Sequence, residues 1–390
     1  MLITGSAELV DLCDRIRATG LCAFDTEFVS EKSYWPKLGL VQIAGPGGHV
    51  GAVDPLALQD LSPLWDLLLS PEMTVVVHAG TMDWRILARQ TGRVPARTFD
   101  SQIAASFLGF GFQVGYGALV EALLGRRIDK SETLTDWLKR PLSPQQIEYA
   151  IGDVTHLLDV HRALEVALSA RGRLEWAKAE FVDAGSIRRF EDPDPYTLHL
   201  GFRRGGGLGR RELAVLRELL AWRELEARAR DARPNYLLKD DVLAAAARRM
   251  PRTEAELATI RGVPTQELRR LGPPLLGAIR RALALPETEL PEVQLPEPQD
   301  AELGLAGALL NTVVVARARE AEVAPEIVMP GPALRALIKD GPDATWPDGQ
   351  AVLAGWRRDV LGQQFIDVLC GQAAVGLDRV TRRVRVVAIG

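Results

Sequence analysis

The first 180 residues alternate short apolar runs with longer segments of helical apolar spacing, and this alternation constrains the fold more than any other feature. It is typical of an α/β domain, in which helices cover a sheet. The expected strands are residues 22–29, 40–44, 49–53 and 74–78. The expected helices are residues 55–69, 81–90, 101–108, 116–124 and 143 to about 170. The last has the clearest start, because Ser143-Pro-Gln-Gln146 supplies a capping hydroxyl, a proline and a reciprocal glutamine.

Two stretches rich in helix breakers divide the rest of the chain. Residues 191–210 contain Glu-Asp-Pro-Asp-Pro and Gly-Gly-Gly-Leu-Gly, and residues 286–299 are acidic and rich in proline. The apolar spacing of 211–285 and of 300 to about 377 is helical. The sequence therefore predicts an α/β domain over 1–190, a linker over 191–210, a helical domain over 211–285, a proline-rich linker over 286–299 and a second helical domain with a tail over 300–390. Residues 380–389 are expected to be a short strand or a tail.

The charge of the chain is unevenly distributed along these segments. The formal net charge is −4, but 18 basic residues face 10 acidic ones in 203–281, whereas 10 basic residues face 15 acidic ones in 282–390. A basic segment suits a phosphate-rich partner, so the middle segment is the expected nucleic-acid contact. The acidic sign of 282–390 predicts a packing or steric element and not a second nucleic-acid contact. The arginines of the basic segment considered for this contact are Arg203, Arg204, Arg210, Arg211, Arg248, Arg249, Arg252, Arg261, Arg269 and Arg270.

Composition disfavours several other classes of protein. Three scattered cysteines fit neither a disulfide framework nor a cysteine-based zinc site, and they favour a reducing cytoplasm. The N-terminal residues lack the basic start and apolar core of a signal peptide, and no run approaches 18 apolar residues. We therefore expect a cytoplasmic protein without a membrane partner, and the sequence indicates no particular protein partner.

Two acids interrupt an otherwise apolar strand in Phe24-Asp25-Thr26-Glu27-Phe28. Residues at i and i+2 of a strand project from the same face, so the carboxylates of Asp25 and Glu27 should lie side by side. Their repulsion and lost hydration destabilise the fold unless a cation or hydrogen-bond donors compensate. An edge strand whose acids meet arginines or backbone donors is the structural alternative.

Two further acids occur in defined local contexts. Asp83 ends the segment His78-Ala-Gly-Thr-Met-Asp83, where a strand turns into a helix, and Tyr149 and Asp153 lie four residues apart on one helical face. Each has a structural alternative, because an acid in a first turn complements the helix dipole, His78 and Tyr149 could belong to the core, and Asp153 could be solvated. The joint occurrence of all four acids and the tyrosine is the informative observation.

In this order and spacing, the five residues resemble the Asp-Glu-Asp-Asp exonuclease superfamily in its tyrosine-bearing subclass. Two further segments look like those that bracket the active site in the bacterial ribonuclease D family, namely Tyr34-Trp-Pro-Lys-Leu-Gly-Leu-Val-Gln-Ile43 and the stretch from Ile128 to Leu142. The segment from Ala221 to Asp241 resembles an HRDC domain. Agreement of motifs covers residues 1 to about 285, and for 300–380 the resemblance rests on domain order. It implies an α/β RNase H-like (DnaQ-like) exonuclease domain followed by two small all-α HRDC-type domains, the second divergent.

The resemblance also implies the chemistry. Two divalent ions, Mg²⁺ or Mn²⁺, roughly 3.5 to 4 Å apart would assist phosphodiester hydrolysis, and such hard cations prefer carboxylate oxygens. Asp25, Glu27 and Asp153 would hold the ion nearest the attacking water, Asp25 would bridge to the second ion, and Asp83 would orient waters. Tyr149 would hydrogen-bond the attacking water. Further substrate contacts are expected from Phe28 and Leu40, which would wedge the terminal nucleotide, and from Lys130 and Arg140, for which a cap or salt bridge is the alternative. Gln42 is expected in the strand core.

The sequence thus predicts a metal-dependent 3′–5′ exoribonuclease that trims structured RNA, by family analogy tRNA precursors, and releases nucleoside 5′-monophosphates. A 3′–5′ DNA exonuclease is the first alternative, because nothing in the residues reports the sugar. The chain has no Gly-x-x-x-x-Gly-Lys-Ser/Thr loop of a helicase ATPase. A non-catalytic RNA-binding scaffold is the second alternative, although all four acids and Tyr149 are present.

Overall fold

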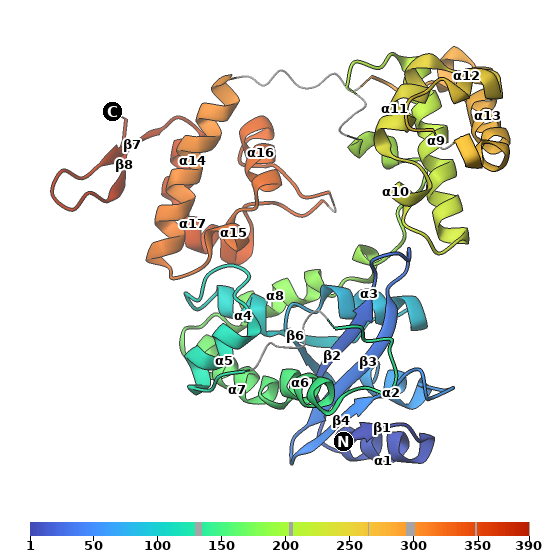
Figure 1. Cartoon of the computed structure of the whole chain (residues 1–390). Helices are drawn as coiled ribbons and strands as arrows, with labels where there is room; N and C mark the ends of the chain where they lie inside the picture. Colours follow the sequence, from blue (N-terminus) through green and yellow to red (C-terminus); the bar gives the residue numbers. More distant parts are fainter. Residues whose placement is uncertain (129–134, 203–205, 264, 294–300, 348, 390) are drawn as a thin grey trace. The chain divides into compact units, whose positions relative to one another are not determined.

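The computed structural model describes residues 1–128, 135–202, 206–263, 265–293, 301–347 and 349–389 (Figure 1). The chain forms two compact units. Unit 1 comprises Met1–Glu27, Leu38–Phe190 and Asp300–Gly390, and unit 2 comprises Phe28–Lys37 and Glu191–Gln299. The last segment of the chain therefore belongs to the same unit as the first, although more than a hundred residues separate them along the sequence.

A six-stranded mixed sheet forms the centre of unit 1, in the order β1-β4-β3-β2-β5-β6. β3 runs antiparallel to β4, whereas β1 is parallel to β4, and β5 is parallel to both β2 and β6. The strands are β1 (Leu2–Ile3), β2 (Leu21–Val29), β3 (Lys37–Gly45), β4 (His49–Val53), β5 (Thr74–Val77) and β6 (Arg97–Asp100).

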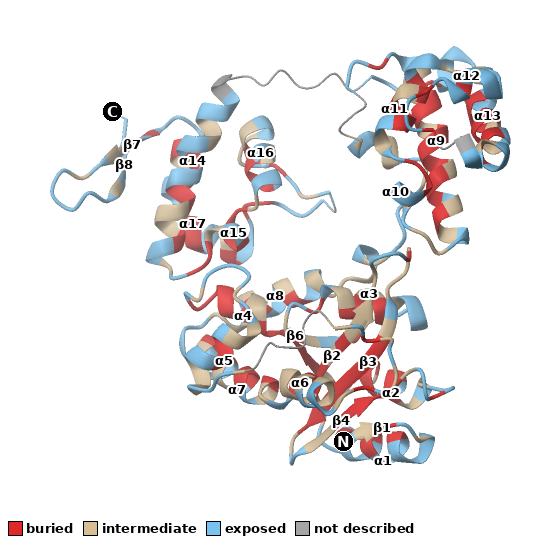
Figure 2. Ribbon diagram, viewed as in Figure 1, coloured by how far each residue is buried: buried red, intermediate tan, exposed pale blue. Residues whose placement is uncertain are grey.

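Alternation along β2 sends its side chains into two different cores, and both faces of the sheet are buried (Figure 2). Cys22 and Phe24 join the core that contains residues of α1 (Ser6–Arg17), α2 (Ser62–Leu68) and α3 (Thr81–Thr91). Ala23 joins the opposite core, under the remaining helices of the unit. Asp25 and Glu27 share the parity of Ala23, so both acids belong to that second face.

The core on the second face continues into helices from a distant part of the chain. It contains residues from the first 190 residues and from 301–369 alike, including Leu164, Phe181, Val314 and Phe365. The helices from the first part are α4 (Ser101–Ser106), α5 (Tyr116–Leu124), α6 (Pro144–Thr155), α7 (Leu157–Ala170) and α8 (Leu174–Ala184). The elements from the last part are α14 (Ala301–Glu320), α15 (Pro325–Val328), α16 (Gly331–Asp340), α17 (Gly355–Leu369), β7 (Ala373–Leu377) and β8 (Val384–Ala388).

Aromatic and charged contacts join the last segment to α8 and to the end of α4. The Trp356 ring lies 4.9 Å from the Phe107 ring and 5.9 Å from the Trp176 ring, measured between centroids. Arg357 bridges both carboxylate oxygens of Glu180 at 3.0 Å, and its guanidinium stacks over Trp356. The last segment is therefore a packing element of unit 1, in agreement with its acidic sign.

Unit 2 is helical and has a core of its own, built from residues such as Leu219, Leu243 and Leu275. Residues 28–37 belong to this unit because Tyr34 bonds Glu224 and Arg228, while the Trp35 amide donates to Asp231 at 3.0 Å. Its helices are η2 (Leu198–Gly201), α9 (Arg210–Ala229), α10 (Pro234–Leu237), α11 (Asp240–Arg249), α12 (Glu254–Ala258), η4 (Thr265–Glu267), α13 (Leu268–Ala284) and η5 (Glu287–Glu289).

The observed elements agree with the expected α/β pattern, with the following differences. The helix expected over 55–69 begins only at Ser62, because residues 54–60 form turns that the Asp54 and Asp60 carboxylates cap. The helix expected over 143–170 is two helices that meet at His156; just before it, the Thr155 hydroxyl donates to the Ile151 carbonyl, a contact that bends helices. Strands β1 and β6 and helices α1 and α8 were not expected. No helix among the described residues is long and apolar enough to cross a membrane.

The Glu180–Arg357 pair provides a test of the packing of the last segment. Replacing Arg357 with Gln leaves the Glu180 carboxylate, which is 14% exposed, without its charged partner. We expect a loss of about 2 kcal/mol in the free energy of local opening of α8 and α17, read by amide hydrogen exchange. Arg358→Gln, at the exposed neighbouring position, is the control and should leave exchange unchanged. Equal exchange in the two variants would contradict a stabilising role for this pair.

Candidate active site

Three carboxylates from two elements converge on the second face of the sheet. Asp25 and Glu27 come from β2, and Asp153 comes from α6. One carboxylate oxygen from each lies within 4.8 Å of the others, a group that could hold a metal ion. These are the same three residues that the family resemblance gives to one ion. The strand alternation of β2 and the position of α6 over this face bring them together.

Burial and mutual repulsion both disfavour the charged forms of these acids. Burial raises the pKa of Asp25 well above its ordinary value, and the charges of Asp83, Asp153 and Glu27 raise it further. Burial also raises the pKa of Glu27 to about 8, with added repulsion from Asp153 and Asp83. A divalent cation would remove this penalty by supplying the missing positive charge. The donor set, oxygen only and without sulfur, fits a hard cation such as Mg²⁺ or Mn²⁺.

Asp83 lies beside this group in the first turn of α3 and is itself buried. Its Oδ1 accepts a hydrogen bond of 2.6 Å from the Thr26 hydroxyl, which projects from the opposite face of β2. Burial raises the pKa of Asp83 to about 6 against the lowering effect of the Thr26 bond, and the charge of Asp100 also raises it. Asp83 does not belong to the trio of possible ligands, but its charge contributes to the raised pKa of Asp25.

The turn before α3 is held by Asp100. The amides of Ala79 and Gly80 each donate to its carboxylate at 3.1 Å, and the same carboxylate caps the start of α4. His78, at the end of the preceding strand, contacts the Ser101 hydroxyl at 2.9 Å, which makes it a hydrogen-bonded core histidine. The position of Asp83 therefore depends on a carboxylate that the sequence interpretation did not single out.

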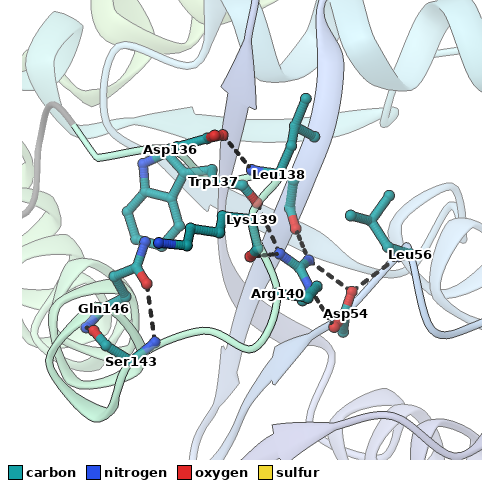
Figure 3. Close-up of polar contacts among 10 residues, drawn as sticks. Asp54, Leu56, Asp136, Trp137, Leu138, Lys139, Arg140, Ser143 and Gln146 are labelled. Carbon is teal, nitrogen blue, oxygen red and sulfur yellow. Dashed lines mark hydrogen bonds and ion pairs between the residues drawn. The ribbon is translucent and has the colours of Figure 1, made fainter.

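Tyr149 lies on α6 one turn before Asp153 and is half-buried. The helix begins as expected, with the Ser143 hydroxyl accepting from the Gln146 amide while the Gln146 side chain accepts from the Ser143 amide (Figure 3). The ring of Trp137 packs at 6.1 Å from the ring of Tyr149. The capping box and this contact together fix where the phenol stands relative to the sheet.

Arg140 anchors the segment that carries Trp137 (Figure 3). Its guanidinium forms two bonds of 2.7 Å to the Asp54 carboxylate and donates to the carbonyls of Gly39, Trp137 and Lys139. Burial would raise the pKa of Asp54, but the bonds from Arg140 keep it below its ordinary value. Gly39 permits this close approach, since a Cβ there would lie 2.7 Å from the Trp137 carbonyl oxygen. Arg140 thus forms the salt bridge that was the alternative to a substrate contact.

The other expected substrate contacts differ in their accessibility. Phe28 is half-buried at the end of β2. Leu40 has no exposed surface in this structure, so it presents nothing for a nucleotide to stack on. Gln42 is fully buried in β3, as expected for strand core, and neither of its amide atoms meets a hydrogen-bond partner among the described residues. Lys130 lies outside the described residues.

Tyr116 is a phenol near the acids that the sequence interpretation missed. Burial raises its pKa, and the negative charges of Asp153 and Asp25 raise it further, so the phenol stays neutral. Its ring lies 5.4 Å from that of His78. In the sequence Tyr116 is only the first residue of a predicted helix, and no local signal connects it with acids on a distant strand.

Two family models match the chain. Residues 1–169 match a model described as 3′–5′ exonuclease, and residues 212–279 match the HRDC domain. Together with the mixed sheet and its carboxylate trio, these matches define a 3′–5′ exonuclease with an attached HRDC domain. The DnaQ-like fold that the resemblance implied is thereby confirmed, with helical regions after it.

Comparison with individual proteins gives the family. The chain is 39% identical to the ribonuclease D of Gluconacetobacter diazotrophicus over 97% of this chain and 95% of that protein. It is 37% identical to the ribonuclease D of Granulibacter bethesdensis over 97% and 94%. The crystal structure of Escherichia coli RNase D covers 95% of this chain and 98% of its own, with a TM-score of 0.85 and 31% identity. The chain belongs to the ribonuclease D family of 3′–5′ exoribonucleases, and it is a hydrolase.

The raised pKa of Glu27 predicts how the metal-free protein responds to pH. The folded state keeps a proton up to about pH 8 that the unfolded state loses near 4.5, so stability should fall as the pH rises through this window. Glu27→Gln removes this contribution, and its melting temperature in EDTA should fall less between pH 5 and pH 8 than that of the wild type. The control Glu148→Gln changes an exposed acid of α6 and should keep the wild-type slope. Parallel slopes for wild type and Glu27→Gln would disprove the burial argument.

Proposed function

We propose that this chain trims the 3′ ends of structured RNA, tRNA precursors among them, by metal-dependent hydrolysis that releases nucleoside 5′-monophosphates. The cluster of Asp25, Glu27 and Asp153 is the observation that carries the proposal. The similar Escherichia coli enzyme is described as an exoribonuclease involved in structured RNA processing. Membership of the same family supports RNA as the substrate class here.

The trio and Asp83 would hold two divalent ions, with Asp25 contributing to both. When bound, such ions promote loss of a proton from the attacking water and stabilise charge on the leaving oxygen. The raised pKa values of Asp25 and Glu27 support this assignment, because a site built for cations is strained without them. Asp83, fixed by Thr26, would accept hydrogen bonds from water at the site.

Tyr149 would orient the attacking water through its phenolic oxygen. An unperturbed phenol has a pKa of about 10 and stays protonated at neutral pH, which favours orientation over proton removal. Packing against Trp137, itself anchored through Arg140 and Asp54, would limit the motion of the ring. The chain would thus separate the two tasks, with carboxylates for the cations and a neutral phenol for the water.

Exposed arginines of unit 2 would bind the RNA backbone. Arg210 and Arg211 are engaged instead with backbone carbonyls at the end of α13 and in the segment after it. Arg252 and Arg261, on either side of α12, and Arg269 on α13 are exposed, and among the described residues they have no ion-pair partner. Guanidinium groups in this state are available for phosphates. Arg203 and Arg204 lie outside the described residues.

An end-labelled 3′-extended tRNA and a DNA oligonucleotide of the same sequence test the activity. Wild-type protein with Mn²⁺ should shorten the RNA stepwise from its 3′ end, and EDTA should stop the reaction. Asp25→Asn should lower the rate by at least about a hundredfold. Mutation of residues that only hydrogen-bond to metal ligands already lowers metal affinity or activity by about 10–100-fold. Its melting temperature without metal should equal or exceed that of the wild type, because one repelling charge is removed. Mn²⁺ should raise the melting temperature of the wild type more than that of the variant.

Each alternative gives a different result in this assay. Shortening of the DNA as efficiently as the RNA would favour the DNA exonuclease. Binding of the RNA without shortening would favour the non-catalytic scaffold. A wild-type melting temperature that does not respond to millimolar Mn²⁺ would contradict the metal requirement. Glu148→Gln, which removes an exposed acid one residue from Tyr149, should behave as the wild type throughout.

The arginines of unit 2 are tested by substitution and not by truncation, because α14–α17 belong to the exonuclease core. Replacing Arg252, Arg261 and Arg269 with Gln should weaken binding of tRNA at physiological salt. The slope of log affinity against log salt concentration is negative, and its magnitude should decrease by about two to three. This is close to one for each phosphate that the variant no longer binds. Hydrolysis of a short oligonucleotide should stay near the wild-type rate.

A matched control removes the same charge elsewhere. Arg319, Arg335 and Arg358 are exposed arginines of the last segment, and their replacement with Gln should leave the salt slope unchanged. A slope that falls equally in both triple variants would mean that only the net charge matters. An unchanged slope in the first variant would exclude these three arginines as RNA contacts.

A further inference from the structure

The C-terminal hairpin of β7 and β8 has a charge opposite to that of the segment around it. Residues 371–389 contain four arginines and one aspartate, whereas residues 282–370 contain six basic and fourteen acidic residues. The negative net charge of 282–390 therefore comes from the residues before the hairpin, and the hairpin itself is basic. The function assigned to the helices, packing, does not explain four arginines on a hairpin.

One face of the hairpin attaches it to the helices of unit 1. Val375 pairs with Val386 in the antiparallel register, and both pack against the core that α14 and α17 help to form. The opposite face carries Arg385 beside Gly376, and Val387 beside Ala374. The hairpin is thus anchored by one apolar face, and the other face together with the connecting turn is exposed to solvent (Figures 1 and 2).

The four arginines are exposed and available. Arg379, Arg382 and Arg383 lie in the turn, Arg385 lies on β8, and none of them forms an ion pair with any residue that the structure describes. The acid of the turn, Asp378, is occupied in holding it, since it accepts hydrogen bonds from the amides of Val380 and Thr381 at 3.0 and 2.8 Å.

The backbone of the turn favours a smaller residue at one of these positions. Arg382 has φ of 59°, in the left-handed region where glycine or asparagine is less strained. Compared with glycine or asparagine, an arginine at this position makes the turn less stable. It also places a long cationic side chain at the tip. The Arg382 side chain is exposed, so burial in the core does not account for it.

We propose that this hairpin is an RNA contact of the exonuclease unit, in which Arg379, Arg382, Arg383 and Arg385 bind backbone phosphates of the substrate. A guanidinium group can donate two hydrogen bonds to the oxygens of one phosphate. Because one face of the hairpin packs on the helices, the arginines of the turn are directed towards solvent. The inference rests on the proposed function, because it takes RNA as the polyanion that meets this surface. An acidic protein is the other possible occupant, and the test below separates the two.

The position of the hairpin in unit 1 gives the proposal a specific consequence. The hairpin and the trio of Asp25, Glu27 and Asp153 belong to one compact unit. An RNA whose 3′ end is at the trio should reach the hairpin only beyond a certain length. Substitution in the hairpin should therefore affect long RNA and leave oligonucleotides of a few nucleotides unaffected.

The test compares Arg379, Arg382 and Arg383 replaced together by Gln with the control in which Arg319, Arg335 and Arg358 are replaced. For tRNA, the hairpin variant should show a KM several-fold higher than that of the wild type, and a salt slope of binding lower by about two to three. On a series of RNA lengths, its KM should match the wild type for the shortest members and diverge above one length. The Arg→Lys triple variant should restore the salt slope, because the charge returns.

The outcomes separate this inference from the function on which it rests. If the wild type shortens no RNA of any length, the proposed function fails. If the wild type shortens RNA but the hairpin variant matches the control at every length and salt concentration, the hairpin is not an RNA contact, whether or not an acidic protein binds it. A KM raised equally for all lengths would also overturn the proposal, since it would indicate a general defect of the active site. Equal melting temperatures of the three proteins confirm that folding is intact.

Discussion

Repulsion between carboxylates that share one face of the sheet is the constraint on which the rest of the structure depends. Asp25 and Glu27 must project together because β2 alternates, and Asp153 is brought to them by α6. The pKa values of both strand acids are raised by burial and by their neighbours, so the metal-free protein stores a penalty here. The surrounding contacts hold these acids in place despite that penalty, and a bound cation would offset it.

Those contacts form two groups. In the first, the Thr26 hydroxyl donates to Asp83, and Asp100 holds the turn that begins α3. In the second, Arg140 anchors the segment of Trp137, and Trp137 packs against Tyr149. In both places a strongly hydrogen-bonded group away from the acidic cluster holds a residue that the proposal assigns to the active site. The fold uses buried polar interactions for orientation at the site, where loose side chains would be least effective.

Local pattern predicted what depends on local geometry. Strand alternation placed Asp25 and Glu27 on one face, and the Ser143 capping box gave the start of α6. That Asp153 meets them depends on how α6 lies on the sheet, and only the family resemblance supplied this. The Asp54–Arg140 pair joins residues 86 positions apart, and no periodicity reports such a pair. The missed helix α1 had a readable signal, since Leu9, Leu12, Cys13 and Ile16 follow helical spacing. The net charge of the whole chain was uninformative. The net charge of a single segment was informative, first for unit 2 and then for the hairpin.

The return of the last segment to the exonuclease core has a consequence for how the protein is made. A chain emerging from the ribosome exposes the sheet and α8 long before α14 and α17 are synthesised, with unit 2 in between. Until then Phe107 and Trp176 lack their aromatic partner Trp356, and Glu180 lacks its cation. A nascent or prematurely terminated chain would present this uncovered apolar face to chaperones and proteases. Completion of the nuclease core would thus be delayed until α17 has been synthesised.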